Sequence, residues 1–268
     1  MDEDLRPSLA TLDRTRPSPA RVYDCLLGGR HHAAVDRALV ARLVDRMPQL
    51  PVITRANRQF LRRAVSTVAG LGVSQFLDLG SGIPTAGNVH EVARRQTPSA
   101  RVAYVDIDPD AVFQSRAILG DDPASCALEA DLLDARRVLT ARSVRGVIDF
   151  GRPVAILLIA SGHFIADTVA LWRALITYRR AAARGSYLVL SHGTAEARPA
   201  EIAELARIYA ESGTPLTARD RIELTRLLDG WTMIDPGLVY TPEWRPDDET
   251  PVDDPGGYST LAVVARKA

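Results

Sequence analysis

The sequence has little cysteine, no surplus of either charge and no long apolar run. Its 33 basic residues are matched by 33 acidic ones, so no basic excess indicates a nucleic-acid footprint. Cys25 and Cys126 lie far apart and without metal-ligand spacing, which favours a reduced, cytoplasmic protein over a disulfide scaffold or a metal site. With 268 residues, 46% of them hydrophobic, the chain is predicted to form one large globular domain with additions.

No segment of the sequence predicts a secretory signal or a membrane anchor. Residues 1–19 are charged, contain prolines and lack an apolar core, so they are expected to form a disordered tail. The most apolar run, Val154–Ala166, is interrupted by Gly162 and His163 and falls short of the roughly 20 residues that cross a bilayer. We therefore expect a buried strand there and no membrane partner.

Apolar spacing divides the remaining chain into a helical extension and an α/β domain. Residues 20–70 hold three groups of apolar residues at helical spacing and are predicted to pack on, or over, the domain as an extension or lid. In residues 71–268 strands alternate with helices, which predicts a Rossmann-like, doubly wound and mostly parallel sheet of seven strands. The last two strands, 231–234 and 258–266, have no crossover helix between them, so an antiparallel hairpin is expected to close the sheet.

One absence is more informative than the others, namely the third glycine of a dinucleotide-binding turn. A predicted strand over 76–79 ends at Gly80–Gly82, and Thr85 stands where the G-x-G-x-x-G fingerprint has its last glycine. Asp78 precedes the turn by two residues. A carboxylate there would repel a pyrophosphate but suits an amino-acid ammonium group. The turn therefore favours S-adenosylmethionine, which has an ammonium and a sulfonium group and no phosphate, over a nicotinamide dinucleotide.

Two more acids follow the next two predicted strands. Asp106 is expected to accept hydrogen bonds from the ribose hydroxyls, and Asp131 to lie near the adenine amino group, with Leu132 against the ring. Ile107 and Ala160, at the ends of the second and fourth strands, complete the predicted cofactor contacts. Parallel strands end at one edge of a sheet, so these side chains are expected to gather there. A single such acid is as often a solvated or capping side chain, but three at successive strand ends indicate a ligand site.

The helical extension contains a candidate lid. Arg21, Tyr23 and Asp24 stand ahead of Gly28-Gly29, so this helix could fold over the cofactor with the glycines as a hinge and with Tyr23 as a contact. The alternative is a surface helix that ends in a glycine cap.

His163 is the candidate catalytic residue. It follows the fourth strand at the edge where an acceptor would meet the methyl group, and its usual pKa near neutrality suits a general base for an oxygen or nitrogen nucleophile. A partly buried histidine bound to a backbone group is an equal alternative. His192, after the fifth strand, is a weaker candidate. His31 and His32 are adjacent, which makes a poor metal pair, and they are expected at the surface.

For two pairs of residues the sequence leaves two alternative positions or roles. Asn57 and Arg58 lie on a predicted helix whose apolar face is structural, and a solvated position is the commoner outcome for them, although they could reach the pocket. Trp244 and Arg245 could anchor the C-terminal loop by packing and ion pairing, or line the acceptor site.

Several longer strings resemble one family. They are FLDLGSGIPTAGNVHEVA, RVYDCLLGG, TRANRQFLRRAV, VAYVDIDP, SYLVLSH and PGLVYTPEWRPD, and together they span nearly the whole chain after about residue 15. These strings are similar to family 19 of the S-adenosylmethionine-dependent methyltransferases, formerly a domain of unknown function. The chain departs from that family's pattern at Arg30-His31-His32. The resemblance implies a class I methyltransferase fold, with a closing antiparallel hairpin typical of it, and S-adenosylmethionine as cofactor. Carried over by position, it implies the following cofactor residues: Asp78, Gly80, Ser81, Gly82, Asp106 and Asp131.

The sequence therefore predicts methyl transfer from S-adenosylmethionine to an oxygen or nitrogen atom of a small-molecule acceptor, which the resemblance does not identify. One alternative is a non-catalytic protein that binds or senses the same cofactor. A less favoured one is a nicotinamide-dependent oxidoreductase, which the missing third glycine and Asp78 argue against.

Overall fold

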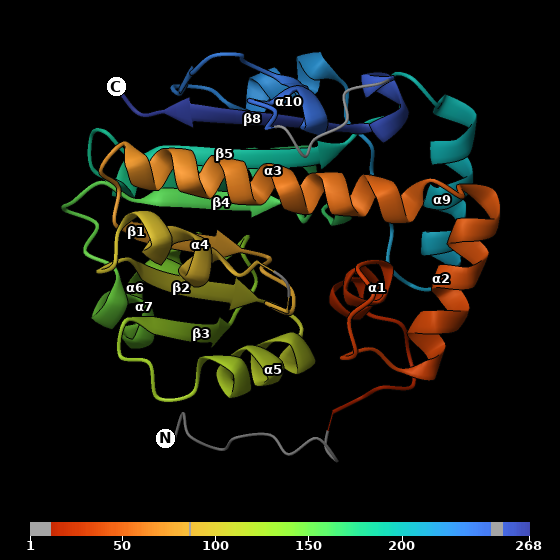
Figure 1. Ribbon diagram of the computed structural model, residues 1–268, viewed down its shortest axis with the longest axis horizontal. Coiled ribbons are helices and arrows are strands. Elements are labelled where there is room, and N and C mark those ends of the chain that lie inside the picture. The colour runs from red at the N-terminus through yellow and green to blue at the C-terminus, as the bar shows by residue number, and fades with distance from the viewer. Residues whose placement is uncertain (1–11, 86, 248–253) are drawn as a thin grey trace.

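A mixed sheet covered by helices on both faces forms the body of the protein (Figure 1). The computed structural model describes residues 12–85, 87–247 and 254–268. The strands there are β1 (Gln75–Leu79), β2 (Arg101–Asp106), β3 (Ser125–Glu129), β4 (Ala155–Ile159), β5 (Tyr187–Gly193), β6 (Thr232–Met233), β7 (Val239–Tyr240) and β8 (Thr260–Arg266). Their order is β3-β2-β1-β4-β5-β8-β6, with β7 also paired to β8. Strands β1 to β5 run parallel, and β8 runs antiparallel to each of its partners.

The predicted fold class and its antiparallel ending are confirmed, with one difference in strand count. Seven strands were predicted, whereas the described residues contain eight. The additional strand is β7, two residues long, which pairs with Leu261 and Ala262 of β8. It lies in the segment 236–255, which the many prolines and acids indicated as loop, and two residues are too short to leave a periodic signal. Part of that segment, 248–253, falls outside the described residues.

The helices form two layers and a cap. On one face of the sheet lie α3 (Leu50–Gly70), α4 (Val89–Gln96) and α5 (Pro109–Leu119). On the other face lie α6 (Ala135–Thr140), α7 (Arg142–Val147), α8 (Thr168–Ala181) and α10 (Arg221–Leu227). The cap consists of α1 (Pro19–Leu26), α2 (Ala34–Arg46) and α9 (Pro199–Glu211), which stand at the end to which the parallel strands point (Figure 1).

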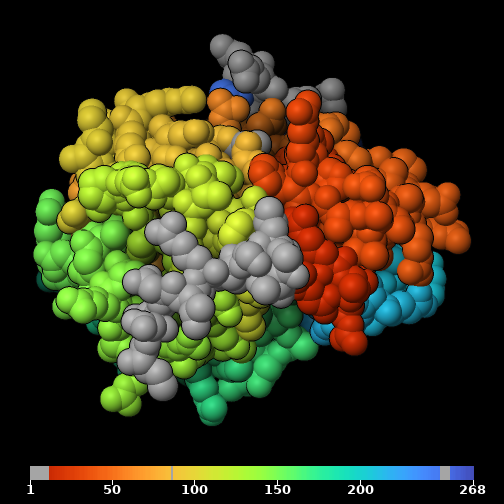
Figure 2. All heavy atoms as spheres, turned by 90° about the horizontal axis from the view of Figure 1, so that it is seen from below, coloured from red at the N-terminus to blue at the C-terminus, as the bar shows by residue number. Residues whose placement is uncertain are grey.

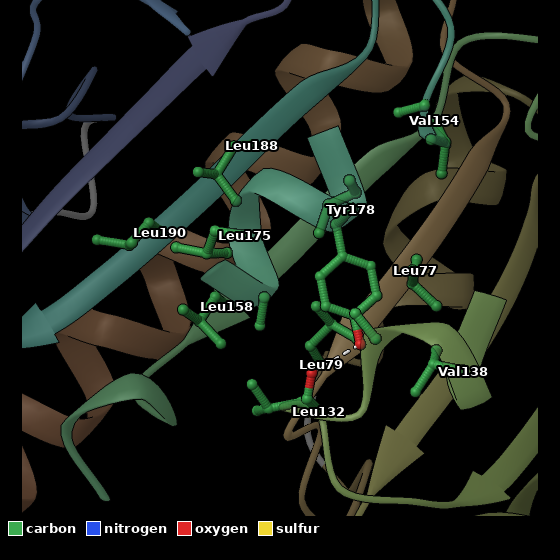
Figure 3. Packing of buried hydrophobic residues seen from close by; sticks show 14 of the residues in the cluster. Leu77, Leu79, Leu132, Val138, Val154, Leu158, Leu175, Tyr178, Leu188 and Leu190 are labelled. Atoms are coloured by element: carbon green, nitrogen blue, oxygen red, sulfur yellow. Dashed lines mark hydrogen bonds between the residues drawn. The ribbon is translucent and has the colours of Figure 1, made fainter. Parts of the chain in front are cut away.

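Strand residues supply both cores by alternation. In β1, Phe76 faces the α3 and α4 side, and Leu77 and Leu79 face the α8 side, as successive residues of a strand must. Every residue of β1 is buried, which is typical of a central parallel strand. On the α8 side, Tyr178 reaches from the helix toward the loop after β3 and donates a 2.8 Å hydrogen bond to the Leu132 carbonyl (Figure 3). This bond ties the loop after β3, where two predicted site residues lie, to the core.

The N-terminal helices are held to the domain by buried charge. Arg21 of α1 is 2% exposed and donates to Asp36 of α2 at 2.8 Å and to Asp110 of α5 at 3.3 Å. Breaking such a buried pair by removing one partner costs about 3–5 kcal/mol, so the network locks α1 against its neighbours. In the space-filling view from below, the red and orange N-terminal helices lie against the lime-green atoms of the α5 region (Figure 2).

The predicted disorder of residues 1–19 does not extend to residue 19. Arg14 donates to both carboxylate oxygens of Asp110, at 2.7 and 3.2 Å, and Ser18 caps α1 while its hydroxyl donates to Asp108. These polar contacts hold a segment that has few apolar residues, and composition alone did not reveal them. Residues 1–11 of the predicted tail lie outside the described residues.

Other expectations about the chain have structural counterparts. The strand predicted within the apolar run 154–166 is β4, and the chain leaves it at Ala160 to form the short 3-10 turn η2 (Gly162–Phe164). Cys25 and Cys126 are both free thiols. Among the described residues, no helix combines the length and apolarity needed to cross a bilayer. In the same residues, no three histidine, cysteine or carboxylate side chains gather at metal-binding distance.

Candidate functional site

One cavity of about 530 Å³ lies between the ends of the parallel strands and the helical cap. Its volume is within the range of small-molecule sites. Every residue predicted for the site lines it: Tyr23, Asp78, Gly80, Ser81, Gly82, Asp106, Ile107, Asp131, Leu132, Ala160 and His163. The structure therefore brings together residues spread over more than half of the sequence, at the edge where a parallel sheet places its ligands.

The glycine turn after β1 is tightly enclosed. Gly80 has a φ of +67° and Gly82 a φ of +61°, which is the left-handed region that favours glycine. A Cβ on Gly80 would lie 2.5 Å from the Cβ of Ser161, in the turn after β4. Ser161 itself is held by a 2.9 Å hydrogen bond from its hydroxyl to the Leu79 carbonyl. The turn after β1 and the turn after β4 therefore lie so close together that only glycine fits at position 80 without a shift.

Replacing Gly80 with Ala is expected to lower stability by about 1–3 kcal/mol through overpacking against Ser161, in addition to left-handed strain of about 1–2 kcal/mol. Gly72→Ala is the matched control, because Gly72 has a φ of +91° and nothing within 4 Å of the added carbon. Chemical denaturation measures both variants. If both variants lose the same free energy of unfolding, the contact with Ser161 does not contribute to the destabilisation.

Asp78 is the most strongly buried charge of the cavity. It is the last residue but one of β1, is 4% exposed and makes no hydrogen bond with another described residue. Burial is the main cause that raises its pKa to about 7; Arg58 lowers the pKa and Asp106 raises it. An unpaired carboxylate at the bottom of a cavity is costly unless a cation or donor arrives. Its position therefore favours a cationic group on the ligand.

Asp106 holds two loops together at the end of β2. One carboxylate oxygen accepts from the Gly82 N–H at 2.7 Å and the other from the Asp108 N–H at 2.9 Å. Burial raises its pKa to about 6, although these backbone donors oppose the shift. Each carboxylate oxygen can accept more than one hydrogen bond. Asp106 can therefore shape the glycine turn and still accept from hydroxyl groups of a ligand.

The remaining strand-end residues differ in burial. Asp131 is exposed and uses one oxygen to accept from the Leu133 N–H at 2.8 Å, whereas Leu132 is 9% exposed. Ile107 is 66% exposed at the rim of the cavity. Ala160 has a φ of +51°, an uncommon value for a residue with a side chain, and its N–H donates to Ser191. Strain of this kind tends to occur at functional sites.

The wall formed by α1 and α3 is more polar than the sequence indicated. Asn57 and Arg58 both line the cavity, so the expectation that they are solvated is wrong. Asn57 donates a 2.8 Å hydrogen bond to the Tyr23 hydroxyl, and the guanidinium of Arg58 lies over the Tyr23 ring, 6.0 Å from its centroid. Within the described residues, Oδ1 of Asn57 and Nε of Arg58 are buried and have no partner. Both atoms are free to bind a ligand.

Of the three lid candidates only Tyr23 reaches the cavity. Arg21 belongs to the buried ion network, and Asp24, 2% exposed, accepts from the Thr85 hydroxyl at 3.0 Å and the His31 N–H at 2.8 Å. A Cβ on Gly29 would lie 2.0 Å from Oδ1 of Asp24. The glycine pair therefore makes a tight turn around Asp24, and the bond from Thr85 to Asp24 attaches α1 to the loop after β1.

His163 and His192 are connected through a buried arginine. Arg219 is 1% exposed and donates to Nε2 of His192 at 2.9 Å and to the Gly162 carbonyl at 3.1 Å. It also donates to the Ile165 carbonyl at 2.7 Å, so it binds the backbone on both sides of His163. No local pattern indicated a role for Arg219, because its acceptors lie about 27 to 57 residues away in the chain.

Both histidines are held neutral. Burial, followed by the effects of His192 and Arg219, lowers the pKa of His163 to about 3. Burial likewise lowers the pKa of His192 to about 4. Nδ1 of His163 accepts from the Gly193 N–H at 3.4 Å, which assigns the ring hydrogen to Nε2. At neutral pH, His163 therefore offers a hydrogen-bond donor to the cavity.

The adjacent histidines and the C-terminal pair lie away from the cavity lining. Nδ1 of His32 contacts Asp24 at 3.1 Å, so this side chain is half-buried and not at the surface as expected. Trp244 is fully buried against Phe60 of α3, with ring centroids 5.4 Å apart, and Arg245 lies over the Trp244 ring. Of the two roles considered for Trp244, anchoring the C-terminal segment is the one that its contacts support.

The contribution of α9 to the cavity was not predicted from the sequence. Ile202, Leu205 and Tyr209 line it together with Leu26 and Ile53 from the N-terminal region. Their spacing along α9 is that of one helical face, so the apolar face was predictable. Its partner was not, because nothing local in the sequence says that α9 packs against α1 to α3.

Comparisons with known proteins agree with this geometry. A protein from Thermobifida fusca YX, assigned as a methyltransferase, is 42% identical with a TM-score of 0.89, over 95% of this chain and 96% of that chain. A DUF574 family protein from Streptomyces avermitilis MA-4680 is 36% identical with a TM-score of 0.91, over 96% and 99% of the two chains. The N-methyltransferase NodS from Bradyrhizobium japonicum WM9, in complex with S-adenosyl-L-homocysteine, is 14% identical with a TM-score of 0.50, over 86% and 97%, and shows the fold alone. No curated protein matches the chain.

The family itself follows from a match along almost the whole sequence. The model that matches describes S-adenosyl methyltransferases (Methyltransf_19) and covers residues 6–268. This match confirms the resemblance seen in the sequence motifs, and with it the class I methyltransferase fold and S-adenosylmethionine as cofactor. It disfavours a nicotinamide-dependent oxidoreductase. The chain belongs to the S-adenosyl methyltransferase family.

Proposed function

We propose that the protein transfers the methyl group of S-adenosylmethionine to an oxygen or nitrogen atom of a small-molecule acceptor bound in the same cavity. The observation that carries this proposal is Asp78, a buried carboxylate beside the glycine turn that lacks a hydrogen-bond partner among the described residues. A sheet edge with this residue at its centre suits a cationic ligand and repels a pyrophosphate.

The charge of the cavity supports the cofactor. Within the described lining, Arg58 is the single permanent cation. The same lining contains five carboxylates: Asp78, Asp106, Asp108, Asp131 and Asp167. The net negative charge favours S-adenosylmethionine, which carries a sulfonium in addition to its amino-acid group. Asp78 would bind the ammonium and the unpartnered Nε of Arg58 the carboxylate. Asp106 would accept from the ribose, and Asp131 and Leu132 would border the adenine.

The chain's contribution to the reaction is mainly alignment. When bound, the cofactor would supply a methyl group already activated on sulfur. The acceptor's lone pair would form the new bond, the sulfur would keep the old bonding pair, and a hydroxyl or amine acceptor would release its proton to water. Holding two reactants in line is worth roughly 7–11 kcal/mol in favourable cases. His163 would orient the acceptor through Nε2–H. Its pKa near 3 makes it a weak base, so orientation is favoured over proton removal.

Calorimetry with S-adenosylmethionine, S-adenosylhomocysteine and NAD⁺ tests the cofactor, and formation of S-adenosylhomocysteine with cell extract tests the reaction. We expect binding of the first two ligands, no binding of NAD⁺, and turnover. Affinity for NAD⁺ alone would overturn the proposal. Cofactor binding without turnover on any acceptor fraction would favour the alternative, a non-catalytic binding or sensor protein.

Replacing Asp106 with Ala is expected to weaken cofactor affinity by about 1–3 kcal/mol, because hydrogen bonds to a charged acceptor are lost. Asp229→Ala is the matched control, since Asp229 is an exposed carboxylate outside the cavity lining. Calorimetric titration measures both variants. Unchanged affinity in Asp106→Ala would remove this residue from the ribose site.

The setting of the reaction also belongs to this proposal. We expect a reducing cytoplasm, since Cys25 and Cys126 are free. We expect neither nucleic acid nor membrane as a partner, because 33 basic residues balance 33 acidic ones and the described helices include no membrane span.

A further inference from the structure

The part of the cavity under the helical cap is apolar. We call it the helical lobe and define it by Leu26, Ile53, Phe164, Ile202, Leu205 and Tyr209. Five of these side chains are at most 9% exposed, Phe164 being the exception, and all six pack in a cluster separate from the two sheet cores. All six line the cavity. The lobe is therefore a preformed apolar part of the cavity, next to the polar strand ends.

Among the residues that the structure describes, the helical lobe is defined by uncharged side chains alone. Of the five cavity carboxylates, two belong to β1 and β2 and three to the segments after β2, β3 and β4, and Arg58 belongs to α3. The acids of α9 have basic or amide partners outside the lobe: Glu201 with Arg198 and Gln49, Glu204 with Arg207, and Glu211 with Arg42. A carboxylate or phosphate bound in the lobe would be desolvated without a partner.

Aromatic rings form one side of the lobe. The rings of His163 and Phe164 meet edge to face with centroids 4.5 Å apart, and Phe164 meets Tyr209 in the same way at 5.5 Å. Such walls favour flat rings, which gain from stacked or edge-to-face contact. The Tyr209 hydroxyl forms no hydrogen bond within the described residues, and burial raises its pKa, so it stays a neutral donor and acceptor. It is a polar group available to a ligand.

Resting on the proposed function, we infer that the acceptor is an uncharged, flat, largely apolar small molecule with two polar groups. One is the oxygen or nitrogen nucleophile, held near Nε2 of His163, and the other hydrogen-bonds the Tyr209 hydroxyl. The ring system between them fills the helical lobe. Selectivity against acids comes from the lack of a cationic side chain among the described residues of the lobe.

Calorimetry on the full chain saturated with S-adenosylhomocysteine tests this inference with three naphthalene probes. They are 2-naphthol, 2,6-dihydroxynaphthalene and 6-hydroxy-2-naphthoic acid. We expect the diol to bind and the acid to bind at least about 10-fold more weakly, because its charge is buried unpaired. The titration with S-adenosylhomocysteine comes first, so a failure there counts against the proposed function and not against the acceptor class.

Two variants locate the probes. Leu205→Trp, which fills the lobe, is expected to weaken the diol more than about 10-fold and to leave S-adenosylhomocysteine binding unchanged. Ile222→Trp is the matched control, because Ile222 is 63% exposed on α10, away from the cavity. Tyr209→Phe is expected to weaken the diol about 2- to 10-fold, the value of one hydrogen bond, and to leave 2-naphthol unchanged.

Four results would overturn the inference. The first is S-adenosylhomocysteine binding with no binding of any naphthalene probe. The second is equal affinity for the acid and the diol, and the third is undiminished diol binding in Leu205→Trp. The fourth is labelled methyl from S-adenosylmethionine entering only the protein or RNA fraction of an extract, which would make the acceptor a macromolecule.

Discussion

Replacing Asp78 with Asn is expected to weaken S-adenosylmethionine binding by about 2–5 kcal/mol and, at the same time, to stabilise the ligand-free protein. Affinity falls because the substitution removes the carboxylate that pairs with the cofactor's ammonium in a buried position. The gain arises because the amide removes a carboxylate whose charged form the fold disfavours, as its pKa of about 7 indicates. Opposite signs for affinity and stability distinguish a binding residue from a structural one.

The direction of the pH dependence follows from the same shift. The pKa of Asp78 rises from 3.8 to about 7 on folding, so the folded state binds more protons between these values. Stability of the ligand-free protein therefore falls as pH rises from about 4 to about 7, by at most about 4 kcal/mol, and stays low above 7. The advantage of Asp78→Asn is largest above pH 7 and small at pH 5.

Cofactor binding shows the opposite trend, because the ammonium needs the ionised carboxylate. Affinity of the unmodified protein is expected to rise between pH 5.5 and 7.5, and Asp78→Asn loses most of this rise. A smaller part remains, since Asp106 has a pKa of about 6. Thermal denaturation and calorimetry at both pH values measure the two effects, with Asp229→Asn as the control. An Asp78→Asn protein that loses both affinity and stability would contradict the assignment.

Replacing Trp244 with Ala is expected to destabilise the protein by about 3–5 kcal/mol, the range for deleting a fully buried aromatic side chain. Trp244 is 0% exposed and packs edge to face on Phe60 of α3. Its carbonyl also accepts from Nε of Arg63, at 3.0 Å. The change would leave a cavity between α3 and the C-terminal segment, and the affinity for cofactor should change little while the fold persists.

Urea denaturation measures this loss, and Trp172→Ala is the matched control. Trp172 lies on α8 and is 36% exposed, so its removal opens no closed cavity. Similar free energies of unfolding for the two variants would mean that the C-terminal segment is not anchored through Trp244.

The strand-end half of the site could be predicted because its signals are local. Asp78, the glycine turn and Asp106 are each defined by a few neighbouring residues, and parallel strands bring their ends together in any doubly wound sheet. The same local reasoning identified His163 by its position after β4. It did not foresee the neutral state of this residue, which comes mainly from burial and, to a smaller extent, from His192 and Arg219, residues distant in sequence.

The helical half could not be predicted because it depends on pairing between distant segments. Gln49 contacts Glu201 across 152 residues, and Arg42 contacts Glu211 across 169. Helical spacing shows that such segments are amphipathic and does not show which face meets which. For the same reason Arg58 was expected in solvent. A polar residue on an amphipathic helix is predicted to be solvated, because the sequence does not show that a cavity lies opposite it.

The pairing of the N-terminal helices with α9 has a consequence for biosynthesis. The apolar faces of α1 and α2 leave the ribosome well before α9 has been translated, and until then they lack the partner that buries them. Contacts of such long sequence separation form late and slowly, and exposed apolar surface is prone to aggregation in the interval. The nascent chain can build its sheet strand by strand, but the compartment beneath the cap closes only after α9 has emerged.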